Sequence, residues 1–400
     1  MATNIRLTLA AALIAITPLS ALAQTPQCKG LPSFKSWVKA FKQDALAAGI
    51  SARTLATAAK QFGYDPSVIK KDRRQGIFSQ SFLQFSDRMV AQYRLDTGRK
   101  NLKKLKSTFS TIEKRFGVPG AVISAFWGLE TDFGANIGKD STLRSLSTLA
   151  YDCRRPEKFR PQLMDALRLI DGGDLKASQM VGAWAGELGQ TQFLPTEYNT
   201  VAVDFDGDGK RNLLTSKGDA LASSANLLKS FGWRRGEPWL QEVVVPKSMA
   251  WEDADLAIKL PRSEWQKRGV RKRDGKSLPL DGLKASLLLP MGRTGPAFLA
   301  YHNFDMFLEW NQSLVYSTTA AYFATRLAGA SKVKRGGKIT PLGHKQIKQL
   351  QRALAKRGFD VGKIDGIIGA KTRAAVKATQ LKLGLPADSY PTGKLLTKIR

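Results

Sequence analysis

The chain has 400 residues, of which 43% are hydrophobic and 9% aromatic, so it has room for two or three globular domains and is not a disordered protein. Its formal net charge of +30 predicts attraction to polyanions such as nucleic acid, anionic lipid or an anionic cell-wall polymer. The basic residues are spread over the whole chain, so part of this charge is expected to be solvated surface.

The first 23 residues are typical of a secretory signal peptide. Arg6 supplies a positive charge, an apolar run follows, and Ala21–Ala23 forms a small-residue cleavage site. No later apolar run is long enough to span a bilayer. The mature protein is therefore expected to begin at Gln24 and to be exported, soluble, to the periplasm, which argues against nucleic acid as its normal partner.

The chain has two cysteines, Cys28 and Cys153. In an oxidising compartment they could pair, and closing so long a loop would add on the order of 4 kcal/mol of stability. We favour this disulfide over two free thiols, although sequence alone does not show that the two residues are close.

Short amphipathic helices are predicted from residue 34 to residue 93, and a charged helix at about 101–116. Gly117–Pro119 should end that helix and start the next one, which carries Glu130. After further helices to about residue 169, the short apolar runs between 243 and 301 predict a small β-rich insertion. Helical patterning then returns to about residue 327.

A linker is predicted at 328–341, where small and basic residues gather, and few contacts are expected between the two units that it joins. The catalytic part would then span 24–327. Residues 342–400 are expected to form a separate compact unit with three helices.

Glu130 lies among aromatic residues in the segment AFWGLETDFG. Helical spacing predicts that it shares a face with Phe126, Trp127 and Phe133, where desolvation would raise its pKa. Such an acid, still protonated near neutral pH, could donate a proton to a glycosidic oxygen. Asp132 should point to the far side of the helix, so the segment offers one isolated acid. A structural, partly buried glutamate is the alternative interpretation.

The segment GAWAGELGQTQFLPTEY is rich in small residues and carries Gln190, Thr191 and Gln192. Small residues let a backbone approach a ligand closely, and amide side chains can hydrogen-bond sugar hydroxyls and N-acetyl groups. By itself the same composition is also typical of a tight turn.

Taken in order, GLETDFG, WAGELGQTQFLP, VDFDGDGKRN and SANLLKSFGW resemble the family of membrane-bound lytic transglycosylase B, over about residues 34–327. The resemblance implies a mainly α, lysozyme-like domain that cleaves the MurNAc–GlcNAc bond of peptidoglycan without water. It implies that Glu130 alone protonates the leaving oxygen and then takes the proton of the MurNAc 6-hydroxyl, which leaves a 1,6-anhydro end. No cofactor would be required, and a monomer is expected.

Residues expected to contact the glycan strand are Gln190, Gln192, Trp310, Asn311 and Tyr316. By the resemblance, Gln192 matches a cleft glutamine, and EWNQSLVYS matches a late cleft motif, YNxSxxY. Trp310 replaces the first tyrosine of that motif, which keeps a stacking ring and loses a hydroxyl.

Two positions depart from the family pattern. Ala183 stands where several relatives have a serine near the scissile bond, and Glu187 replaces a small residue. Glu187 is expected to be structural, but it supports an alternative function, a hydrolytic muramidase that uses two carboxyl groups and water.

VDFDGDGKRN also carries the first half of an EF-hand loop. Thr215 occupies the twelfth position, where a bidentate Glu is usual, so a single weak, structural Ca²⁺ site is expected, with a solvated turn as the alternative. The expected metal ligands are Asp204, Asp206, Asp208, Lys210 and Asp219, the last as in the family.

The C-terminal unit resembles the peptidoglycan-binding-like three-helix module through Asp365-Gly366, Gly369 and Thr372. Thr379 replaces the aromatic residue usual before Gln380. The alternatives are a generic interaction domain for this unit and, for the whole chain, a non-catalytic cell-wall-binding protein. A nucleic-acid binder is disfavoured because no base-reading motif is present.

Overall fold

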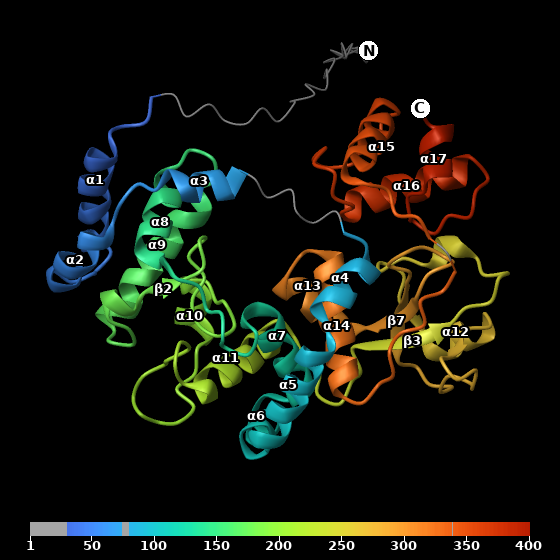
Figure 1. The fold of residues 1–400 in the computed structure, drawn as a ribbon, viewed down its shortest axis with the longest axis horizontal. Coiled ribbons are helices and arrows are strands. Elements are labelled where there is room, and N and C mark those ends of the chain that lie inside the picture. The colour runs from blue at the N-terminus through green and yellow to red at the C-terminus, as the bar shows by residue number, and fades with distance from the viewer. Residues whose placement is uncertain (1–29, 74–79, 338) are drawn as a thin grey trace, which may run out of the picture.

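The computed structural model describes residues 30–73, 80–337 and 339–400 (Figure 1). The predicted signal peptide and Cys28 lie outside these residues, so neither the cleavage site nor the disulfide is tested. Cys153 itself is not a free cysteine. Within the described residues, no helix is both long and apolar enough to cross a membrane.

Helices dominate the structure, and they pack around two large hydrophobic clusters. The first cluster joins the N-terminal helices to later ones: α1 (Phe34–Ala47), α2 (Ala52–Ala58), α3 (Pro66–Arg73), α8 (Thr142–Tyr151), α9 (Pro156–Asp171) and α10 (Pro195–Val201). The second cluster is formed by α4 (Phe82–Met89), α5 (Gln92–Lys104), α6 (Lys106–Phe116), α7 (Gly120–Thr131), α11 (Lys217–Ser230), α13 (His302–Trp310) and α14 (Leu314–Leu327).

The β-rich insertion is confirmed as a five-stranded antiparallel sheet in the order β4-β6-β7-β3-β5. Its helix α12 (Arg262–Lys267) packs into the same small core through Trp265, whose indole N–H donates to the Ala285 carbonyl. The strands are β3 (Leu240–Val244), β4 (Leu260–Pro261), β5 (Arg271–Lys272), β6 (Lys284–Leu288) and β7 (Ala297–Tyr301). A separate two-stranded pairing joins β1 (Asp140–Ser141) to β2 (Val181–Gly182).

The charged segment before α7 differs from its prediction. Instead of one helix at 101–116, α5 begins at Gln92 and stops at Lys104, and α6 follows after Leu105. The predicted end is confirmed: Gly117 has φ +81°, a left-handed conformation that glycine adopts without strain, and Pro119 precedes α7.

Helix α7 is buried on nearly all sides. Every residue in it except Ala121 and Glu130 is buried, and Gly128 allows the rings of Phe133 and Phe323 to approach its backbone. The helix stops at Thr131, and Asp132 and Phe133 both have positive φ. The prediction that Phe133 shares a helical face with Glu130 is therefore wrong, because the chain has already turned away from the helix at Asp132.

The C-terminal three-helix unit is confirmed, with α15 (His344–Lys356), α16 (Ala370–Lys382) and α17 (Gly393–Lys398) around their own core. Buried Gln351 holds the loop between α15 and α16. Its amide donates to the carbonyls of Lys363 and Ile367, and its oxygen accepts from the N–H of Gly366.

The segment 328–341 does not have the few contacts expected of a linker. Val333 is buried, and its N–H donates to the Tyr322 hydroxyl. The next N–H, of Lys334, donates to Glu242 at 2.8 Å. Backbone N–H groups make both hydrogen bonds, and a basic, small-residue composition does not reveal them.

The C-terminal unit is also fastened to the rest of the molecule. Lys377 of α16 pairs with Asp255 at 2.7 Å, and the backbone N–H of Arg293 donates to Asp388 at 2.9 Å. Tyr390 belongs to the same hydrophobic cluster as α7 and α14.

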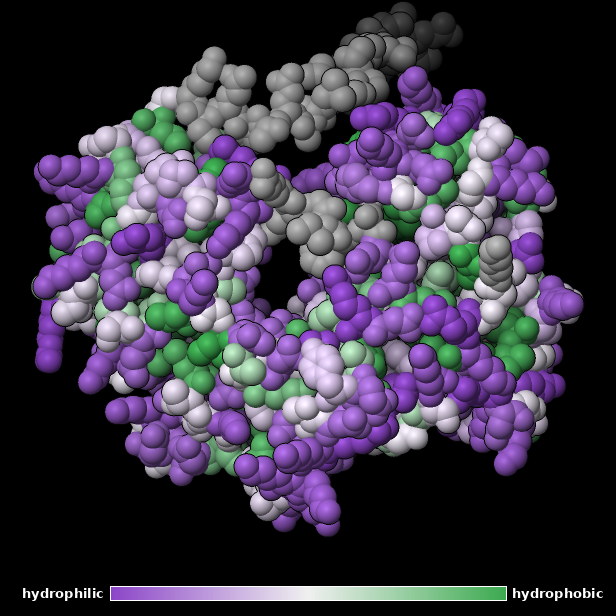
Figure 2. Space-filling view, viewed as in Figure 1, coloured by the Kyte–Doolittle hydropathy of each residue, from purple (hydrophilic) through white to green (hydrophobic). Residues whose placement is uncertain are grey.

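Hydrophilic residues cover most of the visible face of the molecule (Figure 2).

Deleting residues 342–400 is expected to destabilise the remaining core. Removing one buried aromatic side chain costs about 3–5 kcal/mol, and Tyr390 is 5% exposed. At about 2–4 °C per kcal/mol, the melting temperature should fall by on the order of 10 °C. Calorimetry of the truncated and full-length proteins measures this shift.

The point variant Lys377→Ala should also lower the melting temperature, by a smaller amount. Lys371→Ala is its matched control, because the Lys371–Asp360 pair lies within the C-terminal unit and is exposed. For the deletion, a truncated protein with the same melting temperature as the full-length protein would instead support a loosely linked C-terminal unit.

Candidate active site

Three helix ends bring the predicted acid and two aromatic side chains together. Glu130 is the next-to-last residue of α7, Trp310 is the last residue of α13, and Tyr316 lies in the first turn of α14. The N-cap Ser313 starts α14 by accepting a hydrogen bond from the Tyr316 N–H. The short connection between α13 and α14 therefore fixes both aromatic residues relative to Glu130.

Both aromatic side chains donate to the same carboxylate oxygen. The Trp310 indole N–H lies 3.1 Å from Oε1 of Glu130, and the Tyr316 hydroxyl donates to that same oxygen. Both residues were predicted to contact the substrate, and their hydrogen bonds to the acid itself were not predicted.

Burial raises the pKa of Glu130 to about 7, and desolvation is the largest cause. The hydrogen bonds from Tyr316 and Trp310 act in the opposite direction, because they stabilise the carboxylate. The negative end of the α7 dipole also disfavours a charge at this position. The carboxyl group can therefore hold a proton near neutral pH and release it, as a general acid/base requires.

Asp132 does not form a pair with Glu130. It accepts a hydrogen bond from the guanidinium of buried Arg94 at 2.7 Å instead. The prediction of a single isolated acid in this segment agrees with that geometry.

Two other carboxyl groups lie close enough to raise the pKa of Glu130, namely Glu187 and Glu197. Desolvation raises the pKa of each of them as well. Oε2 of Glu187 is buried without a hydrogen-bond partner, whereas Glu197 accepts from the N–H of Leu194 at 3.0 Å. The presence of Glu197 near the acid was not predicted from the sequence. Its position three residues after Leu194 indicates only a carboxylate that caps the start of α10.

The small residues of GAWAGELGQTQFLPTEY allow the backbone to fold back on itself. A Cβ on Gly182 would lie 1.9 Å from the Glu187 carbonyl, so only glycine fits there. Gln192 adopts φ +56°, and its amide donates to the carbonyls of Gly189 and Ile137. This tight loop places Glu187 beside the acid.

The side chains of Gln190 and Asn311 form hydrogen bonds to neighbouring protein groups. Gln190 is 4% exposed; its oxygen accepts from the Trp127 indole, and its amide donates to the Leu214 carbonyl. A role for Gln190 as a substrate ligand does not fit this buried position. Asn311 accepts from the Ser313 N–H at 2.9 Å, so it shapes the connection that carries Trp310 and Tyr316.

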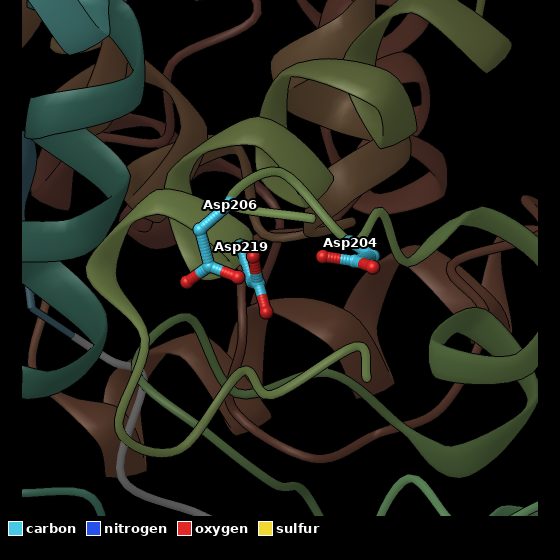
Figure 3. A group of neighbouring side chains, drawn as sticks. All are labelled: Asp204, Asp206 and Asp219. Atoms are coloured by element: carbon cyan, nitrogen blue, oxygen red, sulfur yellow. The ribbon is translucent and has the colours of Figure 1, made fainter. Parts of the chain in front are cut away.

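Three acidic side chains gather at the predicted EF-hand-like loop. Carboxylate oxygens of Asp204, Asp206 and Asp219 all lie within 4.8 Å of one another, with Asp219 reaching in from the first turn of α11 (Figure 3). Burial, with Asp206 adding to it, raises the pKa of Asp219. Hard oxygen ligands of this kind fit Ca²⁺.

The carboxylate of Asp208 does not join that cluster. Asp208 accepts a hydrogen bond from the Lys210 N–H at 2.9 Å, in a local turn. Thr215 accepts from the side chain of Asn212. The structure therefore brings together three of the four expected carboxylate ligands, Asp204, Asp206 and Asp219.

Comparisons with known proteins agree with this geometry. The family model described as "Transglycosylase SLT domain" matches residues 33–325, and the "Putative peptidoglycan binding domain" matches residues 343–399. Membrane-bound lytic murein transglycosylase B of Escherichia coli (strain K12) is 37% identical over 123 residues, which are 30% of this chain and 34% of that protein. That match therefore spans about a third of the curated relative.

Two solved structures cover far more of the molecule. SltB3 from Pseudomonas aeruginosa, in complex with NAG-anhNAM-pentapeptide, is 43% identical, with a TM-score of 0.87 over 92% of this chain and 99% of that chain. Soluble lytic transglycosylase SltB1 from Pseudomonas aeruginosa is 25% identical, with a TM-score of 0.64 over 74% of this chain and 98% of that chain. The chain therefore belongs to the lytic transglycosylases of the transglycosylase SLT family.

Proposed function

We propose that this protein is an exported, periplasmic lytic transglycosylase that cleaves the MurNAc-(1→4)-GlcNAc bond of peptidoglycan. The observation that carries the proposal is the desolvated acid at the end of α7: desolvation raises the pKa of Glu130 to about 7, and its own helix offers no second carboxylate for a nucleophile or base. The bound NAG-anhNAM-pentapeptide of the SltB3 structure supports the same chemistry.

In the proposed reaction, Glu130 acts twice. It first donates its proton to the glycosidic oxygen as the bond to C1 breaks. The resulting carboxylate then accepts the proton of the MurNAc 6-hydroxyl while that oxygen bonds to C1, and a 1,6-anhydro-MurNAc end forms. Water takes no part, so one carboxyl group is sufficient.

The C-terminal unit would bind glycan strands, since its family model is a peptidoglycan-binding domain.

We further propose that the protein works as a monomer. Asp204, Asp206 and Asp219 would hold one structural Ca²⁺ that takes no part in the chemical step. The strongest alternative is a muramidase in which Glu187 activates a water molecule.

Mass spectrometry of the muropeptides released from purified sacculi tests the proposal directly. Products with anhydro ends are expected. Products with reducing ends would favour the muramidase, and an absence of soluble products would favour a cell-wall-binding protein without catalysis.

The substitution Glu130→Gln should reduce turnover by about 10²–10⁴-fold or more, because the amide cannot carry a proton in either step. Muropeptide release under identical conditions gives the ratio. Substantial activity in the purified variant would remove Glu130 from the mechanism.

Thermal unfolding provides the folding control for Glu130→Gln. The pKa of Glu130 is raised from 4.5 to about 7 in the folded protein, so the native chain loses stability as pH rises between those values. The amide does not ionise, and the variant should be at least as stable as the native protein at pH 8.

Glu187→Gln should reduce turnover much less than Glu130→Gln, because its carboxyl group has no proton-transfer step in the proposed reaction. Assays of the two variants on the same substrate decide this point. Equal loss in two folded variants would make the two-carboxylate hydrolase the better interpretation.

Millimolar Ca²⁺ should raise the melting temperature without changing turnover, because a ligand that binds only the native state stabilises it by mass action. The absence of a bidentate Glu predicts a dissociation constant of roughly 10⁻⁴–10⁻³ M. Asp206→Asn should weaken the response to Ca²⁺, whereas Asp208→Asn, outside the cluster, should retain it. A melting temperature indifferent to chelator and Ca²⁺ alike would leave only a solvated turn.

A further inference from the structure

The two hydrogen bonds to Oε1 of Glu130 decide where its proton can reside. A carboxyl oxygen has two lone pairs in its plane, and the Trp310 N–H and the Tyr316 hydroxyl each use one of them. A proton on Oε1 would have to displace one of these donors. The other oxygen, Oε2, accepts from neither residue, so it is the oxygen that carries the proton.

The indole of Trp310 is held in place by neighbouring rings. Phe126, one turn before Glu130 on α7, stacks on it with 4.1 Å between ring centroids and 22° between planes. Phe193 contacts it edge-on at 5.9 Å. Phe126 therefore covers one face of the indole, and the two ring contacts together fix the direction of its N–H.

We propose that Trp310 is a positioning residue: its N–H, with the Tyr316 hydroxyl, confines the proton of Glu130 to Oε2. This inference rests on the proposed function for its consequence. The Oε2–H bond breaks as the glycosidic oxygen gains the proton, and it forms again when the 6-hydroxyl gives up its proton. Both proton transfers then use the same oxygen, and Glu130 forms no covalent bond to the sugar.

Four side chains from different elements affect the protonation of Glu130. Trp310 on α13 and Tyr316 on α14 favour the carboxylate, whereas Glu187 in the 182–193 loop and Glu197 on α10 favour the neutral acid. Replacing Trp310 by phenylalanine removes one donor and leaves the other three groups unchanged. The pKa of Glu130 should therefore rise.

Trp310→Phe in the full chain is the test, because phenylalanine keeps a stacking ring and lacks the N–H. We expect kcat to fall by about tenfold or more with little change in KM, since only the placement of the proton is altered. The alkaline limb of kcat/KM should move to higher pH by about one unit, the size typical for losing a hydrogen bond to a charged group.

Trp265→Phe is the matched control. Its indole also donates a buried hydrogen bond, at 2.8 Å to the Ala285 carbonyl, but it lies in the small core of the β-rich insertion. This variant should lose stability and keep the native pH profile. A Trp310→Phe variant with native kcat and a native pH profile would overturn the proposal, because the retained ring would then account for the role of Trp310.

Infrared spectroscopy gives a readout that needs no turnover. The C=O band of protonated Glu130, identified by its absence in Glu130→Gln, should titrate at higher pH in Trp310→Phe than in the native protein. An unchanged titration would overturn the proposal. If the native protein released no anhydro products, the proposed function would fail, while this titration would still decide the role of Trp310.

Discussion

The structure depends on keeping one carboxyl group out of water at the end of a buried helix. α7 can be buried almost completely because its residues are apolar or small, and its only charged residue, Glu130, lies at the last turn. Desolvation costs the charged form more than the two donors return, so the acid retains a proton near neutral pH. The surrounding elements serve that balance: α13 and α14 bring the donors, and the 182–193 loop and α10 bring further carboxyl groups.

The loop between β2 and α10 (182–193) illustrates how packing and electrostatics are coupled. Gly182 is required because a side chain there would meet the Glu187 carbonyl. The resulting turn holds Glu187 beside Glu130, where the charge of Glu187 raises the pKa of the acid. A residue that the sequence marks as a departure from the family pattern thus tunes the group that the family pattern identifies.

Much of this arrangement could be predicted from the sequence, and the failures have a common cause. The isolated acid, the β-rich insertion and the three C-terminal helices follow from spacing along the chain, which fixes helical faces and strand runs. Gln190 was misassigned because an amide suits a sugar and a buried wall equally well, and only its contacts with Trp127 and Leu214 distinguish them. The hydrogen bond from Trp310 to Glu130 was not predicted, because sequence shows a ring and not the direction of its N–H.

The fastening of the C-terminal unit has a consequence for how a bound polymer would be presented. A module on a free tether samples many orientations, and its benefit depends on the tether's reach. Here the Lys377–Asp255 pair and the hydrogen bond from the Arg293 N–H to Asp388 join the unit directly to the rest of the molecule, and Tyr390 packs in the same cluster as α7 and α14. A glycan strand bound by this unit would therefore reach Glu130 over a narrower range of orientations than a free tether allows.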